Sequence, residues 1–519
     1  MNTAEFLQIS SAVVPDRDAL VCGDQRVTYM EMAQRVNRIA SALIGRGVQR
    51  GASVAVMAMN SPQYIEVYYA CAKTGAVFVP LNYRAKHEEI VHMLKNSEAS
   101  LLFVGERYVE LANSLRPEVP GVKDIICIDG HPTGLASYDD LLAEGSDDEV
   151  YVEIDEGDTT VLMYTSGTTA LPKGVVLTYL TLSVYVVNTM GPADPEQPRE
   201  VTLLSVPLYH VAGLTAIMSS IWGGRTLVVL PQFEPGLWLE AVQNEGVTHS
   251  FVVPTMLKRI MEHPDFDKRD LSSLQLITYG AALMPYEVVR KAVEVFKCGL
   301  MNAYGQTEST STMTFLGPED HRIEGTEEEK EKKLQHLRSV GRPMDDVEIS
   351  IQDSQGNVLA PGKEGEICVR GARIMREYYG QAAATAAAIV DGWLHTGDVG
   401  YQDEDGYLFL TDRTKDLIIR GGENISSGEI ESCLEEHPKI AEAAVIGVLD
   451  VEWGERVKAL VVLEPGEKVT EDEIIQYCKG RLASFKAPSE VTFVEELPRN
   501  HLGKVLKTEL RKIYGRPNG

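Results

Sequence analysis

The sequence predicts an α/β protein with a large N-terminal part, a β-rich stretch and a small α+β unit at the end. Short apolar strands alternate with helical periodicity up to about residue 300, which is typical of mostly parallel sheets covered by helices. The composition changes near Pro318, and glycine-rich β-hairpins are expected beyond it. A last unit begins near Arg413. At about 150 residues per domain, the length of 519 residues is compatible with three compact units.

The alternation is clearest in the first part of the chain. Residues 28–47 place apolar side chains at helical spacing and end on a glycine, which suits a helix C-cap. Residues 52–59, "ASVAVMAM", form an apolar strand, and a Ser-Pro pair then starts a helix over 61–76. Residues 77–81 are again a strand. The same strand pattern returns at 225–231, 248–254 and 274–280.

The second part of the chain has a different character. Residues 318–339 are dense in charge, which indicates a solvated surface insertion or helix. Residues 346–371 have the pattern of β-hairpins. The last unit contains mixed helical and strand-like segments at 427–437, 440–448, 457–464 and 470–482. A small α+β domain is therefore expected there.

The net charge of −27 limits the partners of this protein. Nucleic-acid binding needs a broad basic face, and docking on an anionic membrane needs a polybasic patch. We therefore expect no nucleic-acid partner. An anionic ligand must be held by a local pocket of lysine, arginine and backbone N–H groups.

The cysteines and one long apolar run bear on location. Seven cysteines are scattered without a CxxC pair, so we expect reduced thiols and neither zinc nor a disulfide framework. The N-terminal stretch shows no signal-peptide pattern. Residues 201–224 carry no Asp, Glu, Lys or Arg, but Pro207 and several hydroxyls favour a buried core element over a transmembrane segment. A cytoplasmic protein, monomeric or homodimeric, is expected.

The stretch "YTSGTTALPKG", residues 164–174, is suited to holding phosphate. The common phosphate-binding P-loop has a glycine before its lysine and a hydroxyl after it. Here Pro172 and Gly174 flank Lys173, and the hydroxyls lie upstream instead. A P-loop kinase is therefore disfavoured, while a strand-to-helix turn without a ligand stays the alternative.

Further clusters favour a nucleotide site. "NAYGQTES", residues 302–309, sets an aromatic ring beside a hydroxyl and Glu308, which could hold Mg²⁺ with phosphate oxygens. Asp398 follows a strand-like run, where its carboxylate could accept hydrogen bonds from ribose. The Gly421–Gly422 pair allows close backbone approach to a ligand. Lys504 follows a glycine near the C-terminus and could also contact the ligand, although an ordinary surface lysine is the alternative interpretation.

In this order and at these separations, the clusters resemble the adenylate-forming superfamily of acyl-CoA synthetases, firefly-type luciferases and peptide-synthetase adenylation domains. The resemblance extends from about Thr28 to Lys507. It rests on "YTSGTTALPKG", "YGQTE", "GEICVRG", "WLHTGDVGYQDEDGYL", "DRTKDLIIRGGENISSGEIE" and "PRNHLGKVLK".

The resemblance implies an N-terminal adenylation domain of residues 1–412 and a mobile C-terminal domain of residues 413–519, with a hinge near Lys415. It also implies a two-step reaction of a small-molecule carboxylic acid with ATP and coenzyme A. The carboxylate attacks the α-phosphate of ATP, giving an acyl-adenylate and pyrophosphate. A thiol, usually that of coenzyme A, then displaces AMP.

The resemblance also assigns residues to ATP and Mg²⁺. Lys504 would bridge the reacting carboxylate and the α-phosphate, which Thr307 would contact, and Glu308 with Thr168 would ligate Mg²⁺. Asp398 and Arg413 would bind ribose. The β- and γ-phosphates would be held by Thr165, Ser166, Gly167, Thr168, Thr169 and Lys173. The adenine site would be lined by Gly280, Ala281, Ala282, Asn302, Ala303, Tyr304 and Gly305.

Other residues are implied for coenzyme A and the acid. The coenzyme A set comprises Arg84, Gly421, Gly422, Trp453, Phe485 and Lys486, each with a packing or solvent role as its alternative. His210 would lie against the acyl group, unless it is a core histidine. The pocket around His210, Val211 and Gly213 is apolar with small residues, which favours a fatty, alicyclic or aromatic acid.

Three residues depart from the family pattern: Ala170 and Asp412 replace glycines, and Tyr179 stands where many members have histidine. None of these changes removes a charged or metal-binding group. Alternative functions remain a stand-alone adenylation enzyme that loads a carrier-protein thiol, luciferase-like oxidation of an adenylate, and a nucleotide-binding regulator without catalysis.

Overall fold

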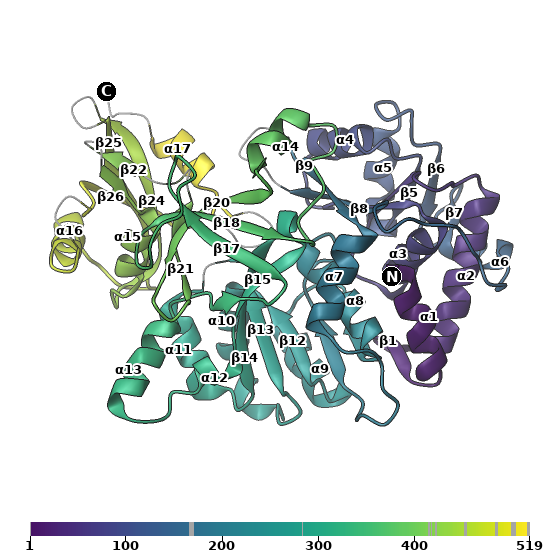
Figure 1. The fold of residues 1–519 in the computed structure, drawn as a ribbon, viewed down its shortest axis with the longest axis horizontal. Coiled ribbons are helices and arrows are strands. Elements are labelled where there is room, and N and C mark those ends of the chain that lie inside the picture. Colours follow the sequence, from purple (N-terminus) through teal and green to yellow (C-terminus); the bar gives the residue numbers. More distant parts are fainter. Residues whose placement is uncertain are drawn as a thin grey trace.

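A computed structural model gives the fold of the chain (Figure 1). It describes residues 2–165, 171–282, 284–413, 416, 418–420, 423–450, 454–482, 486–499 and 505–515. Within these ranges the chain forms two large sheets with their helices, a smaller β-rich subdomain and a C-terminal α+β unit. This is the fold class that the sequence predicts.

The larger sheet of the described chain has nine strands and is parallel through its middle. Antiparallel pairs occur only near its two edges, β1–β2 at one and β14–β15–β16 at the other. In spatial order its strands are β16 (Arg342–Pro343), β15 (Ser311–Leu316), β14 (Gly299–Gln306), β13 (Leu276–Gly280), β12 (His249–Val252), β10 (Val201–Leu204), β11 (Thr226–Val229), β1 (Asp18–Cys22) and β2 (Gln25–Thr28).

The second sheet has seven strands among the described residues, and every neighbouring pair except β8–β9 is parallel. Its strands, in spatial order, are β7 (Ala136–Ser137), β6 (Asp124–Cys127), β5 (Leu101–Val104), β3 (Ser53–Met57), β4 (Val77–Pro80), β8 (Thr159–Thr165) and β9 (Lys173–Thr178). The expected strands at 52–59 and 77–81 are β3 and β4. The parallel order explains why these strands are apolar on both faces.

The helices expected over 28–47 and 61–76 are both present. Helix α2 (Tyr29–Gly45) starts with a capping box of Thr28 and Glu31, and α3 (Pro62–Thr74) ends at Gly75 in the left-handed conformation. The other helices of this part are α1 (Thr3–Val13), α4 (His87–Asn96), α5 (Val109–Leu115), α6 (Tyr138–Glu144), α7 (Tyr179–Thr189), α8 (Val211–Trp222), α9 (Pro235–Glu245), α10 (Pro254–Met261) and α11 (Tyr286–Val295), with 3₁₀ turns at Glu106–Tyr108 (η1) and Phe266–Lys268 (η2).

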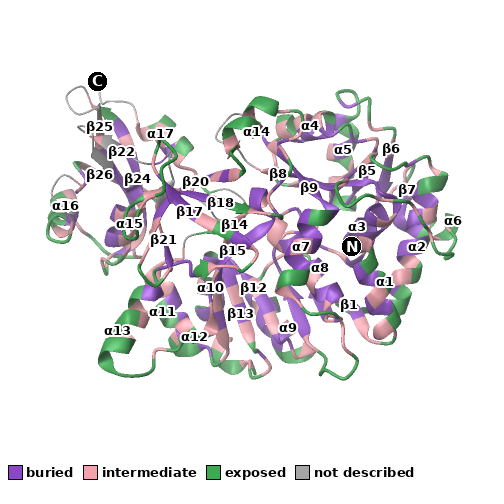
Figure 2. Ribbon diagram, viewed as in Figure 1, coloured by how far each residue is buried: buried purple, intermediate pink, exposed green. Residues whose placement is uncertain are grey.

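The charged stretch 318–339 forms the short helix α12 (Pro318–His321) and the largely exposed α13 (Glu327–His336) (Figure 2). Beyond it lies the β-rich subdomain, in which β17 and β18 form the expected antiparallel hairpin. Its elements are β17 (Val347–Gln352), β18 (Gly365–Gly371), α14 (Ala382–Ala388), β19 (Ile389–Val390), β20 (Trp393–Gln402) and β21 (Leu408–Arg413).

The C-terminal unit has its own sheet and its own hydrophobic core. It lies to one side of the two large sheets in Figure 1. Its elements are β22 (Ile418–Arg420), β23 (Glu423–Ile425), α15 (Ser427–Glu435), β24 (Ile440–Asp450), β25 (Gly454–Leu463), α16 (Glu471–Lys479), β26 (Glu490–Phe493) and α17 (Lys507–Tyr514). The prediction of a small α+β unit is confirmed.

The apolar run 201–224 is split between a strand and a helix. It supplies the buried strand β10 and the helix α8, whose Leu214, Ile217 and Met218 belong to the main core. In the described ranges, no helix has both the length and the apolar character needed to cross a bilayer. The interpretation of this run as a core element is therefore correct.

Candidate active site

The predicted phosphate loop connects two antiparallel strands, β8 and β9. Thr165 at the end of β8 is the register partner of Lys173 at the start of β9. The loop is therefore a strand-to-strand connection rather than the strand-to-helix turn considered as its alternative. Ser166, Gly167, Thr168, Thr169 and Ala170 lie outside the described residues.

Strand β9 also contacts a segment from the β-rich subdomain. The N–H of Tyr379 donates to the Gly174 carbonyl at 2.7 Å, and the N–H of Val176 donates to the Glu377 carbonyl at 3.0 Å. Val175 and Tyr378 form an antiparallel bridge. These bonds join residues about 200 positions apart and fix the subdomain against the phosphate-loop strand.

The same segment holds the turn that contains Glu308. Thr307 and Glu308 lie in a 3₁₀ turn, η3 (Thr307–Ser309), directly after β14, and Glu308 is buried. The hydroxyl of Tyr378 donates to Oε1 of Glu308 at 2.9 Å, and the N–H of Met375 donates to the Glu308 carbonyl at 2.7 Å. The Nζ of Lys173 lies 4.7 Å from the centre of the Tyr378 ring. Lys173 and Glu308 thus both contact the Tyr378 side chain, one at the ring and the other at the hydroxyl.

The turn is followed by unusual backbone. Thr310 and Ser311 both have positive φ, 52° and 78°, in a region that residues other than glycine rarely adopt. The Thr310 hydroxyl is bonded to the Arg373 carbonyl at 2.5 Å, so the surrounding structure holds the conformation. Such strain is concentrated at functional sites in proteins.

The predicted adenine residues come from two adjacent parallel strands. Gly280 at the end of β13 pairs with Ala303 of β14, and a Cβ atom on Gly280 would overlap the Ala303 carbonyl oxygen. Ala281, directly after the strand, has φ +65° and is exposed with Ala282. Asn302 is buried. These carboxyl ends form one edge of the sheet, where ligands of α/β proteins are commonly bound.

Gly305 also has a steric requirement. A Cβ atom on Gly305 would overlap the Ser311 carbonyl oxygen, at the point where the β14–β15 register shifts. A larger residue here would push β15 away from β14. The glycine therefore permits the close approach of β15 to β14 directly before the turn that contains Thr307 and Glu308.

The predicted ribose carboxylate is coupled to the adenine wall. The hydroxyl of Tyr304 donates to Oδ2 of Asp398 at 2.8 Å. Asp398 is buried on β20, and its backbone is opposite Arg413 of β21. The structure thus brings together Tyr304, Asp398 and the backbone of Arg413, whose side chain is not among those described.

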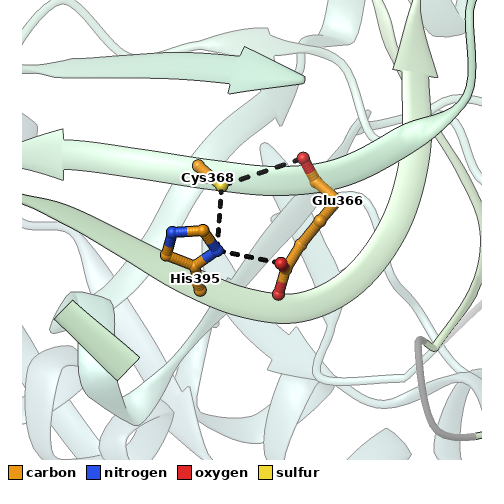
Figure 3. Close-up of side chains that lie close together, drawn as sticks. All are labelled: Glu366, Cys368 and His395. Atoms are coloured by element: carbon orange, nitrogen blue, oxygen red, sulfur yellow. Dashed lines mark hydrogen bonds and ion pairs between the residues drawn. The ribbon is translucent and has the colours of Figure 1, made fainter. Parts of the chain in front are cut away.

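A cluster of Glu366, Cys368 and His395 lies directly before Asp398 (Figure 3). Oε2 of Glu366 is 2.9 Å from Nδ1 of His395, which is 3.5 Å from Sγ of Cys368. Oε1 of Glu366 accepts the N–H of Gly397 at 3.1 Å. The cluster therefore connects β18 and β20 next to a register shift in their pairing.

The spacing of these three side chains is compatible with a metal ion, since their ligand atoms lie within 4.8 Å of one another. However, both Glu366 oxygens already accept hydrogen bonds or face His395. Burial and the Glu366 charge raise the pKa of the Cys368 thiol to about 12, so the thiol stays protonated at neutral pH. We interpret the cluster as a clamp that fixes the strand carrying Asp398.

The predicted acyl side is formed by the start of α8. His210 precedes this helix, and its carbonyl accepts the N–H of Leu214. One turn on, the Thr215 hydroxyl is 3.4 Å from the Ser311 hydroxyl, directly beyond the Glu308 turn. Helix α8 therefore begins next to the predicted metal-binding turn.

The predicted coenzyme A residues are spread over both parts of the chain. Arg84 is exposed after β4, with its guanidinium 5.5 Å from the Tyr83 ring. Lys486 of the C-terminal unit forms an ion pair of 2.6 Å with Glu429. Lys415, Gly421, Gly422, Trp453, Phe485 and Lys504 lie outside the described residues.

Together these contacts link several of the predicted nucleotide-binding residues. The buried carboxylate of Glu308 and the ammonium of Lys173 both contact Tyr378, and Tyr304 of the predicted adenine site is hydrogen-bonded to Asp398. Glu308 fits a Mg²⁺ site because Mg²⁺ prefers one or two carboxylates together with phosphate oxygens. The fold and this set of residues are therefore those expected of a nucleotide-binding α/β enzyme.

Comparison with known proteins identifies the family of this chain. The sequence pattern of the AMP-binding enzyme family matches residues 7–379, and that of the AMP-binding enzyme C-terminal domain matches residues 429–504. The chain belongs to the AMP-binding enzyme family of adenylate-forming enzymes. The predicted enzyme class, an AMP-forming acid–thiol ligase, is confirmed by relatives named as CoA ligases.

Two curated relatives and one solved enzyme illustrate the range. An indoleacetate–CoA ligase from Aromatoleum aromaticum is 36% identical over 99% of both chains. A fatty acid–[acyl-carrier-protein] ligase from Streptomyces coeruleorubidus is 33% identical over 96% of this chain and 94% of its own. The o-succinylbenzoate CoA synthetase of Bacillus subtilis, solved with ATP and magnesium ion, is 30% identical with a TM-score of 0.83 over 98% of this chain and 99% of its own.

Some residues of the site were missed by the sequence reasoning. Tyr378, Glu366 and His395 lie inside or near quoted motifs, but nothing in their local pattern assigns them a role. Their partners are 29 to 70 positions away, so only the pairing of strands reveals the contacts.

Proposed function

We propose that this protein is an AMP-forming acid:CoA ligase that activates an apolar carboxylic acid with ATP and Mg²⁺. The observation that carries the proposal is the convergence of Lys173, Glu308 and the Tyr304–Asp398 pair on one composite site. These residues come from both large sheets and the β-rich subdomain. Their types match the needs of a triphosphate, a metal ion, a base and a ribose.

On the phosphate side, Thr165, the four residues Ser166 to Thr169, and Lys173 hold the β- and γ-phosphates of ATP. Glu308 and Thr168 are the proposed ligands of Mg²⁺. The metal ion, when bound, offsets the negative charge of the phosphate oxygens. Glu308 is suited to this role because its buried carboxylate is oriented by a hydrogen bond from Tyr378.

On the nucleoside side, the edge formed by Gly280 to Ala282 and Asn302 to Gly305 lines the adenine site. Asp398 and Arg413 bind the ribose hydroxyls. The carboxylate of Asp398 already accepts one hydrogen bond from Tyr304 at 2.8 Å. The base and sugar subsites therefore share a hydrogen-bonded pair that sets their separation.

The reaction follows from this arrangement. The carboxylate of the acid attacks the α-phosphate, which Thr307 contacts, and pyrophosphate leaves. Lys504 offsets the repulsion between the two anions, because an ammonium with an ordinary pKa near ~10.4 stays charged at neutral pH. The C-terminal domain, residues 413–519, then rotates about the hinge near Lys415, and the thiol displaces AMP.

The acid is proposed to be uncharged apart from its reacting carboxylate. Val211 and Gly213 at the start of α8 offer apolar, small side chains beside His210. The buried guanidinium of Arg373, behind the Glu308 turn, is 3.3 Å from Asp346, so its charge is already offset. Fatty, alicyclic and aromatic acids fit this setting, and relatives act on indoleacetate and long-chain fatty acids.

The acceptor thiol is proposed to be that of coenzyme A, bound by Arg84, Gly421, Gly422, Trp453, Phe485 and Lys486. Most of the curated relatives compared are CoA ligases or synthetases. The second candidate is a carrier-protein thiol, which the fatty acid–[acyl-carrier-protein] ligase supports.

A panel of fatty, alicyclic and aromatic acids, followed by CoA-dependent AMP formation, tests the proposal. We expect AMP release with at least one apolar acid and none with Glu308→Gln. Acid-dependent AMP release that requires a holo carrier protein instead of coenzyme A would favour the second candidate. The absence of acid-dependent ATP–pyrophosphate exchange across the whole panel would contradict the proposed function.

A further inference from the structure

Tyr378 makes three separate contacts at the phosphate end of the site. Its hydroxyl donates to Oε1 of Glu308 at 2.9 Å, its ring lies 4.7 Å from the Lys173 ammonium, and its backbone pairs with Val175. The side chain is buried with the main hydrophobic core. It therefore lies between the predicted metal ligand and the predicted phosphate lysine.

The position of Tyr378 is fixed from several sides. Flanking backbone hydrogen bonds join Tyr379 to Gly174 and Glu377 to Val176. The N–H of Tyr378 itself donates to the Thr385 hydroxyl at 3.0 Å, on α14. A ring held in this way cannot follow Glu308 if the carboxylate rotates, so the hydroxyl selects one orientation of Glu308.

The chemistry of the hydroxyl suits that task. The Tyr378 hydroxyl carries its proton at neutral pH and donates it to the Glu308 carboxylate. A hydrogen bond to one carboxylate oxygen restricts the rotation of the whole carboxylate group. The face of the Tyr378 ring, which carries negative potential, attracts the Lys173 ammonium that lies over it.

We infer that Tyr378 is a positioning residue for Mg·ATP, which orients the Glu308 carboxylate for the metal ion and holds Lys173 towards the phosphates. This inference rests on the proposed function, because it assumes that Glu308 receives Mg²⁺ and that Lys173 contacts the triphosphate. Residues that orient a metal ligand in this way typically change metal affinity or activity by 10–100-fold when altered.

Titration calorimetry on the full-length protein tests the inference without an acid. Tyr378→Phe keeps the ring and the backbone pairing but removes the hydroxyl. We expect Mg·ATP to bind about 10-fold more weakly to this variant. In EDTA, the affinities of wild type and variant for ATP should differ by less than about twofold, because the lost hydrogen bond acts through the metal ligand Glu308. A matched melting temperature of the two proteins checks the fold.

Tyr407→Phe is the matched control. The Tyr407 hydroxyl also donates to a carboxylate, Oδ1 of Asp320 at 2.6 Å, but outside the site. This variant loses the same kind of bond, and we expect its affinity for Mg·ATP to match that of wild type. A 10-fold loss in Tyr407→Phe as well would mean that any such deletion acts through the fold, and it would overturn the inference.

A double-mutant cycle with Glu308→Gln identifies the partner through which the hydroxyl acts. In the Glu308→Gln background, Tyr378→Phe should weaken Mg·ATP binding by less than about twofold, because the oriented carboxylate is already absent. Full additivity of the two losses would overturn the inference, as would unchanged Mg·ATP affinity in Tyr378→Phe. If wild type binds no ATP under either condition, the proposed function fails together with the inference.

Discussion

The N-terminal part of the candidate site and the C-terminal unit are held in different ways. Around the nucleotide edge, buried side chains from distant segments are joined directly, as in Tyr378–Glu308 and Tyr304–Asp398. Between that part and the C-terminal unit, the described chain shows the ion pair of Arg338 and Glu436, which is largely exposed, and a hydrogen bond from Ser426 to the Thr411 carbonyl. The proposed ATP site is held by buried hydrogen bonds, whereas these two contacts join the C-terminal unit to it in the described chain.

This contrast suits a two-step reaction. A site that holds ATP in one position is favoured by buried hydrogen bonds, while a unit that is proposed to rotate between the steps is favoured by weak contacts. Mutations in the two regions should therefore separate the two half-reactions.

The largest separation is expected for Lys504→Ala. Adenylation should fall by ~100-fold or more, by analogy with the removal of a donor that stabilises a developing charge. Thioester formation from supplied acyl-adenylate should be retained much better, since Lys504 acts in the first step. ATP–pyrophosphate exchange and thioester formation measure the two steps; equal losses in both would refute the assigned role.

A smaller effect on activity is expected for Asp398→Asn, in the N-terminal part of the candidate site. The amide replaces a charged hydrogen-bond acceptor for ribose, and bonds of that kind contribute about 1.5–3 kcal/mol. We expect the KM for ATP to rise by about 10-fold or more, with a smaller change in kcat. Steady-state kinetics over a range of ATP concentrations measures both, and an unchanged KM would remove Asp398 from the ribose subsite.

The C-terminal unit should also show a pH dependence of stability. Burial, with the charges of Glu431 and Glu442, raises the pKa of Glu435 to about 7, against an ordinary value of 4.5. The folded state therefore binds more protons than the unfolded state between these values, and stability is lost as the pH rises through about 7.

Replacing Glu435 with Gln removes this loss. At pH 8 the Tm of Glu435→Gln should exceed that of wild type by a few degrees, at about 2–4 °C for each kcal/mol. At pH 5 the two Tm values should nearly coincide. Thermal melts at both pH values provide the measurement, and a Tm gain that is the same at both would show that Glu435 is not neutral when folded.

The smallest effect is expected for Arg338→Ala, at the junction of the two regions. Exposed ion pairs contribute about 0.2–1 kcal/mol, so each half-reaction should change by less than about fivefold. The ratio of the two half-reaction rates is the measurement. A change of tenfold or more would mean that the junction is held more tightly than its exposed contacts suggest.

Much of the fold could be predicted from sequence because its signals are local. Helix α2 has its capping box, β3 and β4 are apolar on both faces, and the β17–β18 hairpin has glycine-rich turns. The site motifs around Lys173, Glu308 and Asp398 were also visible, since charged and small residues in an apolar setting are unusual.

The contacts among those motifs could not be predicted. Tyr378 is one of 21 tyrosines in the sequence. Its hydroxyl contacts Glu308 because β9 pairs with the segment after β18, and this pairing is not visible in the sequence. The contact of Glu366 with His395 lies at a register shift between β18 and β20. The sequence pattern of neither strand encodes that shift.

The pairing of β9 with residues 376–379 has a practical consequence for engineering. Chimeric enzymes are often assembled by exchanging whole subdomains at loop boundaries. A crossover between Gly174 and Tyr378 would take Lys173 from one parent and Tyr378, whose ring Lys173 contacts, from the other. In a chimera of this chain, the segment from β8 to α14 should therefore come from a single parent, with crossovers placed before β8 or after α14.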